Sequence, residues 1–161
     1  MDPGLACKRG MTLLEIIVVV AIIDLLAAIA IPAYSNYRYM AQVNTAIADI
    51  RGLEVKINAF YADYLRFPQN PGEANKANLL DPWGPPYQYI LIADVPLTGP
   101  GHLQCRKDGS DHPLNSDYDL YSMGRNRDSS LTPRAAKSQD DIVRTDDGKY
   151  VGLVNKSTRE H

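Results

Sequence analysis

Hydrophobic residues form one long block near the N-terminus. Within residues 16–31, IIVVVAIIDLLAAIAI, the single polar residue is Asp24. Counted over residues 11–31, the block has 21 residues, or about 31 Å of α-helix, which matches the ~30 Å hydrocarbon core of a bilayer. The pattern therefore predicts one membrane-spanning helix.

The residues around this block predict how it lies in the membrane. Lys8 and Arg9 precede it, which by the positive-inside rule keeps the N-terminus in the cytoplasm. No small-residue cleavage site follows the block, so we expect a retained anchor and not an ordinary secretory signal. Glu15 and Asp24 each cost about 2.5–3.5 kcal/mol near the centre of such a helix and less near an end. Water can reach Glu15 one turn from the start, whereas Asp24 needs a cation, a polar neighbour, water or a proton.

A second hydrophobic pattern, with helical spacing, follows Pro32. Its apolar residues recur every three or four positions: Val43, Ile47, Ile50, Leu53, Ile57, Phe60 and Tyr64. The pattern predicts an amphipathic helix to about Tyr64, with this stripe packed on a domain core. Pro32 lacks an N–H donor, so we expect it to kink or locally melt the helix and not to end it.

The C-terminal half shows short strand patterns between turn residues. They predict strands at residues 87–93, 117–123 and 150–154. The predicted fold is α+β: a long N-terminal helix, with its first half membrane-spanning, packed on a small antiparallel β-sheet head with a long C-terminal loop. In that loop, Asn126 and Asp128 precede residues 129–139, and Asp140 and Asp141 follow them. Such oxygen donors suit calcium, which takes about 6–8 of them, although a solvated acidic turn has the same composition.

Composition excludes several classes of function. The chain has 161 residues with 17 Lys and Arg against 19 Asp and Glu, so a strongly basic nucleic-acid-binding surface is not expected. It contains no G-x-S-x-G, H-E-x-x-H, Walker or G-x-G-x-x-G motif, so we do not expect an enzyme. Of the two cysteines, Cys7 lies in the N-terminal leader, which leaves Cys105 without a disulfide partner and the long loop in need of another closure.

The segment KRGMTLLEIIVVVAIIDLLAAIAIP resembles the class III signal and N-terminal helix of type IV pilins and type II secretion pseudopilins. The resemblance implies cleavage after Gly10 by a prepilin peptidase and methylation of the new amine of Met11. It also implies that the Glu15 carboxylate meets the N-terminal ammonium of a neighbouring subunit during assembly. Asp24 and Pro32 belong to the same assembly segment, and Asp24 stands where relatives usually carry a small or apolar residue.

The segments DPWGPPYQY and DYDLYSM more specifically resemble the major pseudopilin of type II secretion. In that family a calcium ion closes the C-terminal loop. The resemblance implies that calcium binds here to the carbonyl of Met123, to Asn126 and Asp128 through side chains or carbonyls, and to the carboxylates of Asp140 and Asp141. Asn126 stands where relatives usually have aspartate.

The resemblance implies four regions: a cleaved leader (1–10), a transmembrane assembly helix (11–32), an amphipathic second half of the helix (33–65) and a periplasmic head (66–161). The implied function is a structural subunit of a type II secretion pseudopilus. Its implied partners are further copies in a helical filament, minor pseudopilins, an inner-membrane assembly platform and the prepilin peptidase, but no nucleic acid. The subunit is expected in the bacterial inner membrane as a single-pass protein, and then in a periplasmic or surface filament.

Two other functions fit the sequence less well. A type IV pilin of a surface filament for adhesion or motility is disfavoured by the missing cysteine pair and by the DPWG segment. A single-span membrane protein with a periplasmic binding or enzymatic head requires that Lys8, Arg9 and Gly10 stay in the mature chain.

Overall fold

A computed structural model describes residues 10–74, 79–93, 105–107 and 113–154 of the chain. By compactness the chain divides into two units, Met1–Tyr39 and Met40–His161. The first unit contains the N-terminal part of a long helix, and the second contains the rest of that helix with a β-sheet. Each unit is described in turn.

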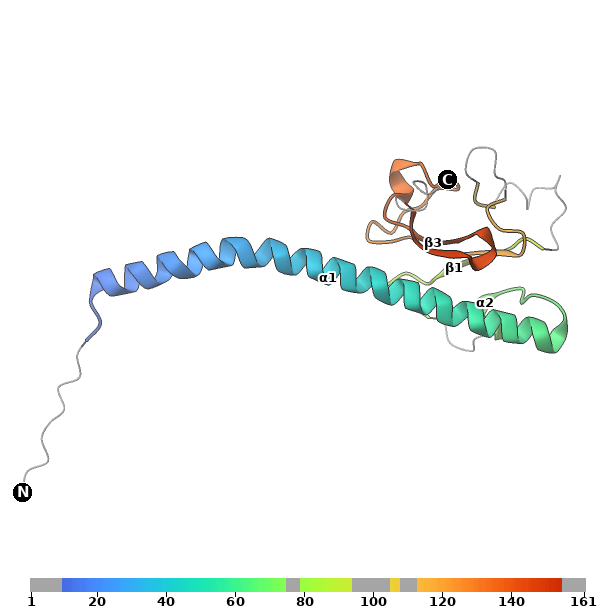
Figure 1. Cartoon of the computed structure of the whole chain (residues 1–161), viewed down its shortest axis with the longest axis horizontal. Coiled ribbons are helices and arrows are strands. Elements are labelled where there is room, and N and C mark those ends of the chain that lie inside the picture. Colours follow the sequence, from blue (N-terminus) through green and yellow to red (C-terminus); the bar gives the residue numbers. More distant parts are fainter. Residues whose placement is uncertain (1–9, 75–78, 94–104, 108–112, 155–161) are drawn as a thin grey trace, which may run out of the picture. The chain divides into compact units, whose positions relative to one another are not determined.

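The helix α1 spans Leu13–Tyr64 and has 52 residues. Figure 1 shows it as one unbroken ribbon, and Pro32 lies inside it. Pro32 removes one N–H donor, but strong helix-forming residues on both sides continue the helical pattern through it. The prediction that the helix continues past Pro32 to about Tyr64 is confirmed.

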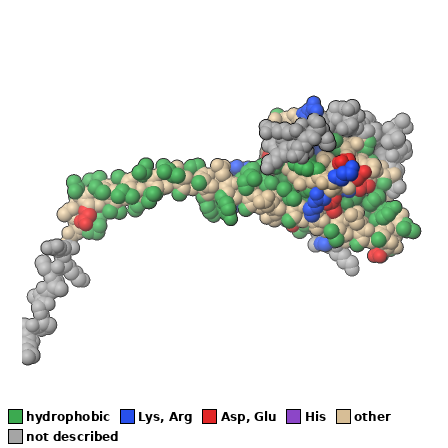
Figure 2. Space-filling view, viewed as in Figure 1, with side chains coloured by type: hydrophobic (Ala, Val, Ile, Leu, Met, Phe, Trp, Pro, Cys, Tyr) green, Lys and Arg blue, Asp and Glu red, His purple; other side chains and the backbone are tan. Residues whose placement is uncertain are grey.

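Apolar side chains surround α1 in the first unit. Hydrophobic side chains gather along this stretch in Figure 2, and every large aliphatic residue of the predicted span that the structure describes is solvent-exposed within this single chain. Of the described helices, α1 is the one that is long and apolar enough to cross a membrane. A bare apolar helix of this length needs a surrounding of lipid or protein.

In the second unit α1 is amphipathic and packs on the head. Its buried apolar residues are Val43, Ala46, Ile50, Leu53 and Ile57. The predicted stripe is therefore confirmed from Val43 to Ile57, although Ile47 is only half-buried and Tyr64 is exposed. The stripe also contains a buried carboxylate, Glu54, which periodicity does not predict.

The sheet of the head has four antiparallel strands in the order β1-β2-β3-β4. The strands are β1 (Gln88–Leu91), β2 (Tyr118–Ser122), β3 (Ile142–Thr145) and β4 (Tyr150–Leu153). The α+β prediction is confirmed, and β1, β2 and β4 lie inside the three predicted strands. β3 was not predicted. Its first three residues are all buried, so the strand shows no alternation of buried and exposed positions.

Short elements complete the second unit. They are the helix α2 (Pro71–Ala74) and two 3-10 turns, η2 (Ala136–Ser138) and η3 (Asp146–Gly148). The DPWG segment packs close to α1, because Tyr87 donates its hydroxyl proton to Asp49 at 2.8 Å and Gln42 donates to the Pro82 carbonyl at 3.2 Å. Trp83 is buried, as expected for a residue packed between helix and sheet.

Candidate functional site

The predicted processing site lies at the start of the described chain. Gly10 and Met11 are solvent-exposed and precede the first helical residue, Leu13. A Cβ on Gly10 would meet no atom within 4 Å, so the fold of this chain does not require glycine there. The basic residues Lys8 and Arg9 of the leader lie outside the described residues.

Glu15 belongs to a capping box at the N-terminus of α1. The backbone N–H of Glu15 donates to Thr12 Oγ1 at 3.2 Å, and the backbone N–H of Thr12 donates to Glu15 Oε2 at 3.4 Å. This reciprocal pair satisfies two N–H groups that have no partner inside the helix. The signal was visible as T-x-x-E before an apolar run, and sequence reasoning missed it. Glu15 therefore has a structural role within one chain beside its predicted assembly role.

The other two predicted assembly residues lie farther along α1. Asp24 is exposed, and no hydrogen bond or ion pair joins it to another described residue. Nine positions separate it from Glu15, so the two carboxylates lie about 180° apart around the helix. The structure thus places Glu15 and Asp24 on opposite faces and does not bring them together. Pro32 lies between Asp24 and the start of the second unit.

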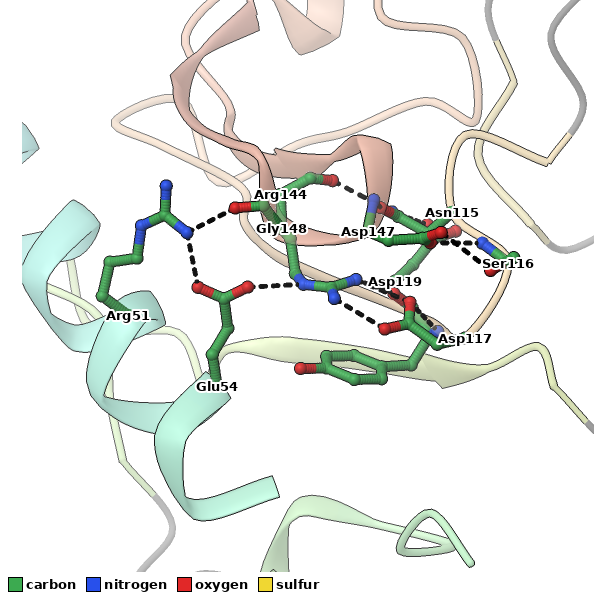
Figure 3. Close-up of polar contacts among 10 residues, drawn as sticks. Arg51, Glu54, Asn115, Ser116, Asp117, Asp119, Arg144, Asp147 and Gly148 are labelled. Carbon is green, nitrogen blue, oxygen red and sulfur yellow. Dashed lines mark hydrogen bonds and ion pairs between the residues drawn. The ribbon is translucent and has the colours of Figure 1, made fainter. Parts of the chain in front are cut away.

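A buried ion-pair cluster joins the second half of α1 to the sheet, and sequence reasoning missed it. Arg144 on β3 is 3% exposed, and its Nε donates to Glu54 Oε1 of α1 at 2.7 Å. Its terminal nitrogens donate to both carboxylate oxygens of Asp117, at 2.7 and 2.6 Å. Figure 3 shows the guanidinium between these two carboxylates. A bidentate pair of this kind fixes orientation as well as charge.

Further contacts complete the cluster. The Arg51 Nη1 atom donates to Glu54 Oε2 at 2.9 Å and to the Gly148 carbonyl at 2.6 Å (Figure 3). Gly148 has φ +88°, and a Cβ there would overlap the Glu54 carboxylate. Burial disfavours the charged form of Arg144, but the hydrogen bonds that it donates to Asp117 and Glu54 outweigh this effect and raise the pKa of Arg144. Arg144 therefore joins α1 to β3 through its ion pair with Glu54.

A second buried pair lies beside the C-terminal loop. Arg106 donates to Asp141 Oδ2 at 2.7 Å, and Ser129 donates its hydroxyl proton to the same oxygen at 2.6 Å. Asp141 is 0% exposed, and burial raises the pKa of its carboxyl group although both donors oppose the shift. The guanidinium of Arg106 also lies over the Tyr121 ring, 4.3 Å from its centroid. Asp141, a predicted calcium ligand, therefore holds an internal cation.

The other predicted ligands lie close together in the loop. Asp140 Oδ2 accepts the Asn126 backbone N–H at 2.8 Å, and Asn126 Oδ1 accepts the Asp128 N–H at 2.7 Å. Gly124 has φ +65°, and a Cβ there would overlap the Asp140 backbone carbonyl, so glycine allows the two ends of the loop to meet. Lys137 pairs with Asp128 at 2.6 Å and lowers its pKa through that hydrogen bond.

Two of the predicted ligands carry internal cations. Among the residues that the structure describes, no three Asp, Glu, His or Cys side chains are grouped so that they could hold a metal ion. Asp141 points to Arg106, and the Lys137 ammonium lies on Asp128. Calcium binding at these residues stays a prediction. Lys137 would have to leave Asp128 only if the Asp128 carboxylate, and not its carbonyl, is the ligand.

We expect calcium to raise the melting midpoint of a fragment that begins at Met40, and replacement of Lys137 by methionine to lower the calcium concentration needed. A ligand that binds only the folded state stabilises it in proportion to its saturation, and Lys137→Met removes a competing cation. The measurement is thermal melting in calcium and in excess chelator, with magnesium as the matched ion. Equal midpoints for both proteins in both solutions would show that the loop is closed by its own side chains.

Comparison with known proteins identifies relatives of two kinds. The chain is 33% identical over 91 residues to a fimbrial protein of Neisseria meningitidis serogroup A, covering 56% of this chain and 54% of that protein. It is 37% identical over 71 residues to the type IV major pilin protein PilE1 of Neisseria gonorrhoeae, covering 44% and 43%. It is 29% identical over 138 residues to the type II secretion system core protein G of Pseudomonas aeruginosa, covering 73% and 83%.

The chain spans about half the length of the pilins that it matches, and most of the length of the secretion protein. No family model and no solved structure matches it. The structure has an apolar N-terminal helix that continues into an α+β head. The relatives are pilins and a secretion-system core protein, and they indicate the class of protein to which this architecture corresponds. The chain is similar both to type IV pilins and to a type II secretion pseudopilin. The names of these relatives are those of a fimbrial protein, a major pilin and a secretion-system core protein, and none of the three is the name of an enzyme.

Proposed function

We propose that the chain is a structural subunit of a type II secretion pseudopilus, which polymerises through the first half of α1 to drive protein export. The observation that carries this proposal is the extent of the likeness to core protein G, which covers 83% of that protein. The pilin likenesses have higher identity but cover only about half of each pilin. The likeness to core protein G thus extends over a larger share of the chain.

The structure supports polymerisation through this helix. The first unit leaves its whole apolar surface exposed, which no single chain can cover in water. In the membrane, lipid covers it, and in a filament, neighbouring copies would cover it. The subunit would therefore move from the inner membrane into a periplasmic filament, with minor pseudopilins and an inner-membrane assembly platform as partners.

A type IV pilin of a surface filament is the second candidate, because the matched pilins are 33% and 37% identical to the chain. Deletion of the gene in its own host separates the two functions. We expect the deletion to stop export of proteins secreted by the type II system while surface pili and twitching motility persist. Lost pili with unchanged export would overturn the pseudopilus assignment in favour of the pilin.

Cleavage after Gly10 is the processing step that this function requires. We expect the mature chain to begin at Met11, with a methylated amine and 151 residues, because Lys8 and Arg9 place the cut on the cytoplasmic side. Gly10→Val should block the cut by placing a branched side chain at the peptidase site, and Gly10 has no role in this fold that would explain the loss otherwise. Mass spectrometry of the N-terminal peptide from assembled filaments measures cleavage and methylation together.

Recovery of the intact leader MDPGLACKRG from filaments would contradict this processing. It would favour a single-span membrane protein with a periplasmic binding or enzymatic head.

A further inference from the structure

Asp24 is an isolated charge on an apolar surface. It is the only charged side chain between Glu15 and Arg38 in the sequence, and its neighbours on α1 are aliphatic. It is exposed, and no ion pair joins it to another described residue. A carboxylate in this position is costly in lipid and costly between packed helices, so it needs a cation once the helices assemble.

Arg38 is the next charged side chain along the helix. It is exposed, and the described residues offer it no ion-pair partner either. It lies 14 residues after Asp24, about 21 Å along the axis, so the two charges cannot meet within one chain. Fourteen residues are close to four helical turns, which places Asp24 and Arg38 within about 40° of each other on one face.

The other cations near α1 are less suited to Asp24. Arg51 is held by Glu54 and the Gly148 carbonyl, and Arg66 pairs with Glu73 at 3.0 Å. Lys8 and Arg9 lie in the leader, which the proposed cleavage removes. The N-terminal ammonium is the partner already assigned to Glu15. Arg38 is therefore the cation that remains in the first unit, since Lys56 lies farther along α1 in the second unit.

We propose that Arg38 of one copy pairs with Asp24 of a neighbouring copy displaced by about 21 Å along the helix axis. This pairing rests on the proposed function, because it requires that the helices pack side by side in a filament. Arg38 follows the apolar span by seven residues, so in a subunit still anchored in the bilayer it lies outside the hydrocarbon core. A neighbouring subunit that has moved outward by this displacement of about 21 Å has its Asp24 at the level of the Arg38 of the anchored subunit. Each newly inserted subunit thus supplies the cation that the previous subunit needs as it leaves the lipid.

Charge exchange in the full chain tests the pairing in cells that assemble the filament. We expect Asp24→Asn and Arg38→Gln each to lower filament yield per membrane-inserted subunit by about tenfold, the effect of removing one partner of a desolvated pair. The exchange of both charges, Asp24→Arg with Arg38→Asp, should restore most of the yield. Lys56→Gln is the matched control, because Lys56 lies on the same helix but in the head unit, and it should leave the yield unchanged.

Cross-linking tests the stagger directly. Two differently tagged copies, both with Cys105→Ala, carry Asp24→Cys and Arg38→Cys respectively, and oxidation should give a mixed dimer. Asn36→Cys in place of Arg38→Cys is the control, since position 36 lies about 160° from position 38 around the helix. The pairing would be overturned, and the proposed function kept, if the wild-type chain forms filaments while Arg38→Gln leaves their yield undiminished and no mixed dimer forms between positions 24 and 38. A wild-type chain that forms no filament would overturn the proposed function as well.

Discussion

Replacing Arg144 by methionine is expected to cost about 3–5 kcal/mol of the free energy of unfolding of the head, because it leaves Asp117 without a cation and Glu54 with only the half-exposed Arg51. Glu54 lies 2.7 Å from Arg144 and Asp117 lies 2.6 Å from it, and the side chains of both are less than a fifth exposed. Denaturation of a fragment that begins at Met40 measures the change. Few single substitutions, apart from those that remove a disulfide or a metal, change the free energy of unfolding by so much.

The neighbouring Arg51 is the matched control. It also contacts Glu54, but its side chain is 45% exposed, so Arg51→Met should cost less than about 1 kcal/mol. Glu54→Gln in the Arg144→Met background should recover part of the loss, because it removes one of the two carboxylates that lose Arg144. Equal unfolding midpoints for Arg144→Met and Arg51→Met would show that the cluster does not hold α1 on the sheet.

The assembly role of Glu15 can be separated from its capping role. Glu15→Gln keeps an oxygen that accepts the Thr12 N–H but removes the charge, whereas Thr12→Ala removes the cap and keeps the charge. We expect Glu15→Gln to lower filament yield by about tenfold or more, since the neighbour's ammonium loses its partner, and Thr12→Ala to have a small effect. The measurement is sheared filament per membrane-inserted subunit. The reverse order of the two yields would assign Glu15 to helix capping and remove the proposed pairing.

The long helix and its inward face were predictable because their period is carried by many residues. The stripe from Val43 to Ile57 repeats over four turns, so single exceptions such as half-buried Ile47 do not hide it. The capping box was also visible in the sequence, since Thr12 and Glu15 have the required spacing. Signals that depend on the spacing of nearby residues, such as the apolar stripe and the capping box, can be detected in a single sequence.

The buried polar contacts were not predictable in the same way. Glu54 and Arg144 are 90 residues apart, and each is ordinary in its own local pattern. β3 leaves a weak signal because its first three residues, the third of which is Arg144, are all buried and show no alternation. The loop shows the same limit: its composition predicts oxygen donors, but only the structure shows that Lys137 and Arg106 are paired with two of them.

The order of the strands has a consequence for how the head folds. Because β1, β2, β3 and β4 pair in the order in which they occur in the chain, the sheet is a meander of low contact order and can form from successive hairpins. The contact from Arg144 to Glu54 closes a loop of 90 residues, so docking of the sheet onto α1 carries a larger loop-closure entropy than the pairing of successive strands. A head caught before that step would hold a formed sheet and an undocked amphipathic helix, and would expose the two surfaces that Arg144 joins.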